Sequence, residues 1–159
     1  MDQPIVARDM MVRNLVTLSP EMDTSQAIDV LLRHRISGAP VVDTWGRFLG
    51  IFSEKSSLEF VIHTTYDALP TANLMQFVQT DPPTISEDTD LLTIAQTFLD
   101  ASCRRLPVLC RSGRLLGQIS RRDLLRAVRS SMKQATPVAA EHGGSLYLSA
   151  IFNSGQRPF

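Results

Sequence analysis

Short apolar runs occupy residues 39–42 and 106–109, and each is followed by a polar turn and a second such run, at 47–52 and 115–119. Continuous apolar character is typical of strands that are buried on both faces. A glycine lies in each turn, Gly46 in the first and Gly113 in the second, so the pattern predicts two hairpins. Further short strands are predicted at 15–18 and 84–85, and a weaker alternation predicts one at 145–152.

Helical spacing of apolar residues precedes each hairpin. Asp23 followed by Gln26 is typical of a helix N-cap with a capping box. Each of these two helices has one apolar face, and we expect that face to be buried. It contains Ala27, Ile28, Leu31 and Leu32 in the first helix, and Ile94, Ala95, Phe98 and Leu99 in the second.

Two further helices are predicted after the hairpins, over 55–65 and 121–133. A short helical turn is predicted near the start of the chain, at 8–11. In the first of them we expect Leu58, Val61 and Ile62 to face inward. Leu125 and Val128 hold the positions of Leu58 and Val61 in the second helix. Residues 66–72 then link the two halves.

The two halves of the chain repeat at a single offset. Pro40 and Pro107 lie 67 positions apart, and six other identical pairs keep this separation: Thr17 and Thr84, Ser19 and Ser86, Asp23 and Asp90, Gly46 and Gly113, Gly50 and Gly117, and Ser53 and Ser120. The match runs without a gap to about residue 62, which indicates an internal duplication. We therefore expect a first repeat with its lead-in at 1–67, a second with its linker at 68–133, and a tail at 134–159 that is flexible or contains one short strand.

Composition narrows the function classes. An apolar content of 43% and a charged content of 20% suit a globular protein, and a formal net charge of zero argues against a polyelectrolyte binder. Cys103 and Cys110 form no C-x-x-C motif, and we find no signal peptide and no apolar run of the ~18 residues that span a membrane. We expect a cytoplasmic protein without a membrane partner.

No constellation of residues predicts catalysis or metal binding. The sequence has no G-x-S-x-G motif, no P-loop and no paired carboxylates in a defined frame, so we expect no enzymatic activity. His34, His63 and His142 lack metal-ligand spacing, and His34 is expected at a helix end. Cys103 has two arginine neighbours that could lower its thiol pKa, but we favour a buried structural thiol. Trp45 is expected as a surface contact rather than a stacking platform.

The strongest candidate for a binding site lies at 104–123. Ser120 and Asp123 are three residues apart at a predicted strand-to-helix junction, where both side chains can point into one groove. A carboxylate can accept from a diol and the guanidiniums of Arg104 and Arg105 can bind phosphate, which suggests a nucleotide pocket. Two plainer interpretations stay open. Ser120 and Asp123 are usual residues at a helix N-terminus, and the two arginines can form a solvated edge.

Each half resembles a CBS domain, and the pair resembles a Bateman module. The resemblance covers about 6–130 and rests on the APVV and LPVL runs, the Gly-Arg-apolar-apolar-Gly runs and the G-x-x-S-x-x-D motif of Gly117, Ser120 and Asp123. It implies an α/β fold of tandem CBS repeats, each strand-helix-strand-strand-helix, packed as a pseudo-two-fold pair with two clefts.

The resemblance also implies a regulatory module that senses an adenosine-containing nucleotide. Candidate ligands are AMP, ADP, ATP and S-adenosylmethionine, with no obligatory cofactor. In the family the motif aspartate commonly holds ribose hydroxyls, which implicates Asp123 beside Ser120, with Arg122 near the phosphate. The cleft would be completed by residues of the opposite first strand and of the loops before the hairpins: Asn14, Val16, Ile36, Ser37, Arg104 and Arg105. The second cleft is expected to be weak, because Ser56, beside Ser53, stands where the second repeat has Asp123.

Family pairs often form flat dimers through their helices, so we expect a homodimer and an effector protein in trans. The expected dimer surface contains Leu58, Val61, Phe60, Leu124, Leu125 and Val128. One alternative is a dimerisation or interaction module without a ligand. Another is nucleic-acid binding through the basic second repeat, whose last helix carries Arg121, Arg122, Arg126 and Arg129; missing aromatic interleaving disfavours it.

Overall fold

The computed structural model describes residues 4–67 and 72–134. The helices are α1 (Ala7–Met10), α2 (Thr24–His34), α3 (Glu54–Asp67), the 3-10 helix η1 (Leu74–Phe77), α4 (Leu91–Asp100) and α5 (Arg121–Gln134). The strands are β1 (Gly38–Val42), β2 (Phe48–Ser53), β3 (Ile85–Ser86), β4 (Arg105–Leu109) and β5 (Leu115–Ser120). The strand expected at 145–152 lies outside the described residues.

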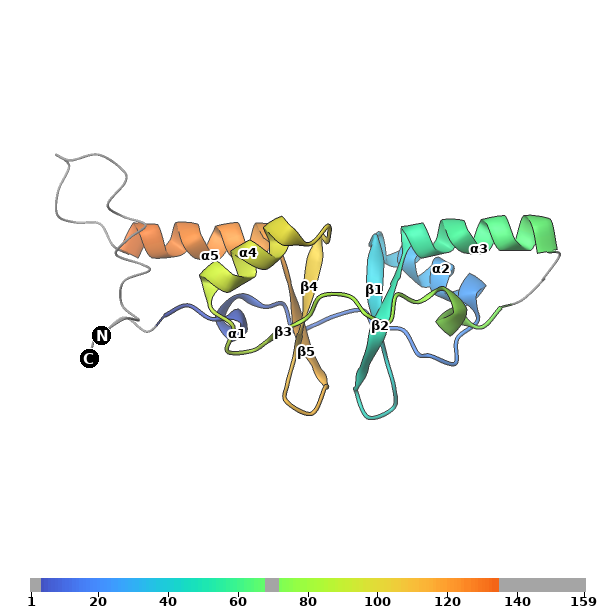
Figure 1. The fold of residues 1–159 in the computed structure, drawn as a ribbon, viewed down its shortest axis with the longest axis horizontal. Helices are drawn as coiled ribbons and strands as arrows, with labels where there is room; N and C mark the ends of the chain where they lie inside the picture. Colours follow the sequence, from blue (N-terminus) through green and yellow to red (C-terminus); the bar gives the residue numbers. More distant parts are fainter. Residues whose placement is uncertain (1–3, 68–71, 135–159) are drawn as a thin grey trace.

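Each repeat is a small sheet covered by helices. β1 and β2 form an antiparallel hairpin, and β4 and β5 form another, with β3 added in parallel to β4. Figure 1 shows the two units side by side, with α3 and α5 along one edge of the molecule and the hairpin loops at the opposite edge. Both predicted hairpins and all four predicted long helices are present.

The strand predicted at 15–18 is absent, although its counterpart β3 forms. Leu18 makes only a single parallel bridge, with Val41. The next rung of a parallel ladder would need the N–H two residues after Leu18, and this residue is Pro20, which has none. At the equivalent position the second repeat has Glu87, which keeps its N–H. The 67-residue offset therefore does not preserve every strand.

The segment in front of each repeat packs on the other repeat. Val12 bridges Gln118 and Gln79 bridges Ile51, and these two pairs are the same contact shifted by 67 positions. The bridges Val6–Asp90 and Asn73–Asp23 form a second such set. Accordingly, Ala7 and Met11 lie in the core of the second repeat, and Leu74 lies in the core of the first. The two cores are thus interlocked about a pseudo-two-fold axis.

The repeated glycines Gly50 and Gly117 permit this crossing. A Cβ on Gly50 would lie 2.3 Å from the carbonyl oxygen of Gln79, and one on Gly117 would lie 2.7 Å from that of Val12. Side chains cannot approach backbone so closely, so only glycine lets the crossing segment pair with the hairpin. The last glycine of each Gly-Arg-apolar-apolar-Gly run is explained by this contact.

The inward faces predicted for the helices are partly wrong. Leu32 and Leu99, at equivalent positions, are 72% and 80% exposed. Leu58, Val61, Ile62 and Leu125 are also exposed, whereas Phe60 and Leu124 are buried and Val128 packs against the second core. A helix that covers one narrow sheet buries a single stripe, as Ala27 with Leu31 and Ile94 with Phe98 do, and leaves the neighbouring apolar positions outside.

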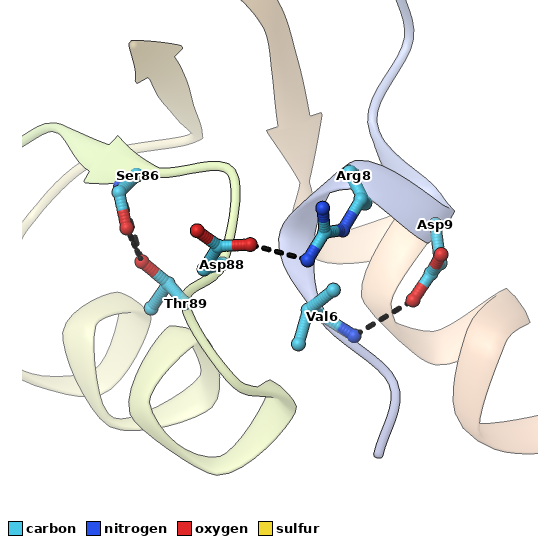
Figure 2. Close-up of polar contacts among 6 residues, drawn as sticks. All are labelled: Val6, Arg8, Asp9, Ser86, Asp88 and Thr89. Atoms are coloured by element: carbon cyan, nitrogen blue, oxygen red, sulfur yellow. Dashed lines mark hydrogen bonds and ion pairs between the residues drawn. The ribbon is translucent and has the colours of Figure 1, made fainter. Parts of the chain in front are cut away.

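Polar contacts fasten α1 to the second repeat, as Figure 2 shows. Arg8 pairs with Asp88 of the β3–α4 turn. Within the segment itself, the backbone N–H of Val6, the N-cap residue of α1, donates to Asp9 Oδ2 at 3.0 Å. The backbone N–H of Ala7 donates to the carbonyl of Thr89 at 2.9 Å. Because α1 is held in place, the extended chain that follows it enters the space between the repeats in a defined position.

Candidate functional site

A cleft of about 290 Å³ lies between the repeats. The extended segment after α1, the loop and start of β1, and the β4–β5–α5 unit all contribute to it. Its lining is Val12, Asn14, Leu15, Val16, Ile36, Gly38, Pro40, Arg105, Gln118, Ser120 and Asp123. Six of the residues expected from the sequence are thereby brought together: Asn14, Val16, Ile36, Arg105, Ser120 and Asp123.

Ser120 and Asp123 form a reciprocal cap at the junction of β5 and α5. The backbone N–H and the hydroxyl of Ser120 donate to Asp123 Oδ2 at 2.8 and 2.6 Å. In return, the backbone N–H of Asp123 donates to Ser120 Oγ at 3.2 Å. The plain interpretation as a helix cap is therefore correct, and it is compatible with a binding role because the cap fixes the carboxylate at the wall of the cleft.

The carboxylate keeps capacity for a ligand. Its side chain is 14% exposed, and Oδ1 lies 3.4 Å from Arg126 Nη1, one turn along α5. A carboxylate can accept through about four lone-pair sites, so these partners do not saturate it. Hydroxyl groups entering the cleft could still donate to Asp123.

Arg105 brings a positive charge to the same cleft. It opens β4, its Cα is the register partner of Ser120, and it forms no ion pair with any other residue of 4–67 and 72–134. The remaining lining is mainly apolar, from Val12, Leu15, Val16, Ile36 and Pro40. This combination of a diol acceptor, a free guanidinium and apolar walls suits a ligand with a planar ring, vicinal hydroxyls and an anionic group.

Three expected residues stand outside the lining of the cleft. Arg104 and Arg122 are exposed, and Ser37 uses its backbone carbonyl to accept from the N–H of Glu54 at 2.9 Å. Sequence reasoning missed Val12, Leu15, Gly38, Pro40 and Gln118. A signal existed for Val12, because it shares a face with Asn14 and Val16 in an extended chain.

The equivalent position in the first repeat has a different character. Ser53 and Ser56 place their hydroxyl oxygens 3.3 Å apart, and Ser56 is only 6% exposed. Gly38 stands where the second repeat has Arg105, and Asp81 stands where the first has Asn14. This position therefore has neither the motif carboxylate nor the cation, and Asp81 would repel an anion.

The thiol of Cys103 behaves differently from the expectation based on its arginine neighbours. Burial raises the pKa of Cys103, and the opposing effect of the Arg121 charge is smaller. The pKa of Cys110 is lowered, chiefly by its hydrogen-bonded contact with the hydroxyl of Ser112 at 3.0 Å between Sγ and Oγ. The lowered pKa considered for Cys103 is therefore not found, and the raised pKa agrees with the favoured interpretation as a structural thiol, here partly buried.

Within 4–67 and 72–134, no group of three or more His, Cys, Asp or Glu residues could hold a metal ion. In the same ranges no helix has the length and apolar character needed to cross a bilayer. His34 is the last residue of α2, as expected, and His63 packs edge-on against Phe77.

Comparison with protein families gives two matches within the chain. The CBS-domain family model matches residues 7–56 and 74–130. The chain belongs to the CBS-domain family. The predicted α/β fold of tandem CBS repeats is thereby confirmed.

The CBS pair is also similar to part of several larger proteins. It is 27% identical over 124 residues to the uncharacterized protein MJ1225 of Methanocaldococcus jannaschii, covering 77% of this chain and 42% of that protein. It is 27% identical over 116 residues to inosine-5'-monophosphate dehydrogenase of Aquifex aeolicus, covering 73% of this chain and 23% of the enzyme. The chain thus spans less than half the length of either relative.

Solved structures of CBS pairs share the fold. CBSX2 from Arabidopsis thaliana superposes with a TM-score of 0.71 at 23% identity, covering 84% of this chain and all (100%) of that chain. CBSX2 has also been solved in complex with AMP, with a TM-score of 0.69, 23% identity and coverage of 79% and 96%. The CBS domain pair of MJ0100, in complex with 5'-methylthioadenosine and S-adenosyl-L-methionine, gives 0.67 at 17% identity, covering 80% and 98%.

Proposed function

We propose that this CBS pair is a regulatory module that binds an adenosine-containing ligand in the cleft lined by Asn14, Arg105 and Asp123. The observation that carries the proposal is that a capped carboxylate lines one apolar cleft together with a guanidinium that has no ion-pair partner among residues 4–67 and 72–134. In this assignment Asp123 accepts hydrogen bonds from the ribose hydroxyls, and Arg105 pairs with phosphate. Val16 and Ile36 supply apolar contacts for the adenine ring.

Ligands of similar proteins support the ligand class. CBSX2 is described in complex with AMP, and the CBS pair of MJ0100 with 5'-methylthioadenosine and S-adenosyl-L-methionine. Among the candidate ligands AMP, ADP, ATP and S-adenosylmethionine, a phosphate-bearing one suits Arg105 best. We assign the chain no catalytic role, and its two free cysteines suit the reducing cytoplasm.

The test is a binding measurement on protein that has been unfolded, dialysed and refolded to remove retained ligand. Mass spectrometry of the small molecules released when the purified protein is unfolded identifies any adenosine compound that copurifies. Calorimetry then measures the binding of added AMP to the refolded protein. Saturable binding of AMP supports the proposal. If no adenine nucleotide binds and none shifts the melting temperature, the proposal is wrong and the alternative of a ligand-free dimerisation or interaction module is favoured.

We further propose that the chain forms a homodimer through α3 and α5. The two helices lie along one edge of the molecule, and Leu58 and Leu125, at equivalent positions, are 65% and 68% exposed. Burying apolar area of this kind contributes roughly 25 cal/mol per Å². Phe60 and Leu124 are buried within the repeats, so they do not belong to this surface.

A further inference from the structure

The loops of the two hairpins, 43–47 and 110–114, are joined to each other; together they are called the hairpin-tip surface. The backbone N–H of Phe48 donates to the carbonyl of Gly113 at 3.0 Å, and that of Leu115 donates to the carbonyl of Gly46 at 3.0 Å. Between these reciprocal bonds, Arg47 and Arg114 form an antiparallel bridge. The two loops therefore form one fixed unit across the pseudo-two-fold axis.

Within the first loop, the backbone is held by a carboxylate. Asp43 Oδ1 accepts from the backbone N–H groups of Trp45 and Arg47, both at 2.9 Å. Trp45 nevertheless projects outward and is 73% exposed. A tryptophan this exposed on an ordered turn offers a large apolar contact at little cost in backbone entropy.

Three arginines accompany Trp45. Arg47, Arg111 and Arg114 are all exposed, and none forms an ion pair within the described part of the chain. The Nε atom of Arg114 lies 3.6 Å from the position that a Cβ on Gly46 would take, so its guanidinium lies over the turn next to Trp45. Against these three cations the two loops contain one carboxylate, Asp43, which is already engaged.

We propose that the hairpin-tip surface docks an acidic segment of a partner protein, with an apolar side chain of that segment covering Trp45. Tryptophan and arginine are the residues most enriched at the energetic centres of protein interfaces, and guanidiniums bind carboxylates through paired hydrogen bonds. The surface carries a small positive excess, which matches a short segment with two or three carboxylates. Nucleic-acid binding depends on many phosphate contacts, and three arginines supply few.

The surface is separate from the nucleotide cleft, since none of Trp45, Arg47, Arg111 and Arg114 lines it. The two proposals can therefore fail independently. Variants of the tip are expected to leave AMP binding unchanged, and loss of Asp123 is expected to leave peptide binding unchanged.

The test is a selection of random 12-residue displayed peptides on the full wild-type chain, with counter-selection on Arg47→Ser/Arg114→Ser. We expect enriched peptides to contain Asp or Glu beside an apolar residue. The enriched peptides are then synthesised, and their affinities are measured by fluorescence anisotropy. They should bind the double variant and Trp45→Ser at least about tenfold more weakly than the wild-type chain. Arg47→Lys/Arg114→Lys should retain part of the binding, and Arg129→Ser, an exposed arginine elsewhere, should retain all of it.

Melting curves of the variants separate loss of binding from loss of fold. The proposal is overturned if the enriched peptides lack acidic residues, or if they bind the double variant as tightly as the wild type. A 12-nucleotide uridine RNA serves as the competing probe. The proposal is wrong, and the partner is nucleic acid, if this RNA binds the wild type but not the double variant and no acidic peptide is enriched.

Discussion

The hydroxyl of Ser120 donates a 2.6 Å hydrogen bond to Asp123 Oδ2, and the backbone N–H of Asp123 donates a 3.2 Å bond back to Ser120 Oγ. The same pair caps α5 and fixes a carboxylate at the inter-repeat cleft. Because the carboxylate of Asp123 serves both roles whereas the hydroxyl of Ser120 serves only the cap, substitutions can separate them.

Asp123→Ala should weaken AMP binding far more than it destabilises the fold. Loss of charged hydrogen bonds to the ribose costs roughly 2–3 kcal/mol, or about 30- to 150-fold in affinity. Loss of the cap costs only about 1 kcal/mol of folding free energy. Calorimetry and urea unfolding measure the two effects. The control Ser120→Ala removes the hydroxyl part of the cap and keeps the carboxylate, so its loss of affinity should be smaller. Equal losses in both variants would mean that the carboxylate does not contact the ligand.

Arg105 should make AMP bind better than adenosine. One charge-assisted hydrogen bond contributes roughly 1.5–3 kcal/mol, so we expect a preference of about tenfold or more that shrinks as salt rises. Arg105→Ala should abolish the preference. Arg104→Ala is the matched control, because this neighbouring arginine is exposed and does not line the cleft. A preference lost in the Arg104 variant and kept in the Arg105 variant would reverse the assignment.

Each chain should bind one ligand tightly. Ser56 and Gly38 replace the motif carboxylate and the cation at the equivalent position, so the second site is expected to be weak or empty. The stoichiometry from calorimetry checks this directly. Ser56→Asp should add a second, weaker site for adenosine, since Ser53 can orient the new carboxylate as Ser120 orients Asp123. Two equal sites in the wild-type chain would contradict the assignment.

Leu58→Asp and Leu125→Asp should convert the proposed dimer to a monomer. Both leucines are exposed in the single chain, so the charge is tolerated there but not within an apolar interface. Light scattering at tens of micromolar measures the mass. Leu92→Asp, an exposed leucine of α4, should remain dimeric. A monomeric wild-type chain at these concentrations would rule out the dimer.

The two thiols should react at different rates. The lowered pKa of Cys110 increases its thiolate fraction near neutral pH, whereas the raised pKa of Cys103 keeps that thiol protonated. Modification by iodoacetamide at pH 7.5 should therefore show a fast phase from Cys110 and a slow phase from Cys103. The rate of the slow phase should continue to rise with pH after the rate of the fast phase has levelled off. Cys110→Ser should remove the fast phase. Loss of the slow phase in this variant would show that the assignment is reversed.

The sequence was sufficient for the hairpins and the long helices, because glycines and capping residues mark their ends. The residue pattern alone did not show that Val12 pairs with Gln118, since this pairing is made by backbone hydrogen bonds between distant parts of the chain. Only the family resemblance placed the neighbouring Asn14 and Val16 at the cleft of the second repeat. The residue pattern also misjudged Leu32 and Leu99, because helical spacing does not tell how wide a stripe the small sheet can cover.

For the site, the motif and the family resemblance suggested Asn14, Ser120 and Asp123, which the fold brings into one cleft. The sequence could not choose between Arg104 and Arg105, since adjacent residues at a strand start point in different directions. The first repeat has Gly38 at the position of Arg105. The sequence did not show that this difference removes a cation from the second site, because that requires the pairing of Arg105 with Ser120.

A crystal structure of the chain grown with AMP tests the central claim most directly. We predict one AMP per chain, with both ribose hydroxyls within hydrogen-bonding distance of Asp123 and the phosphate at Arg105. AMP bound beside Ser56 instead, or a cleft that stays empty at saturating AMP, would contradict the account.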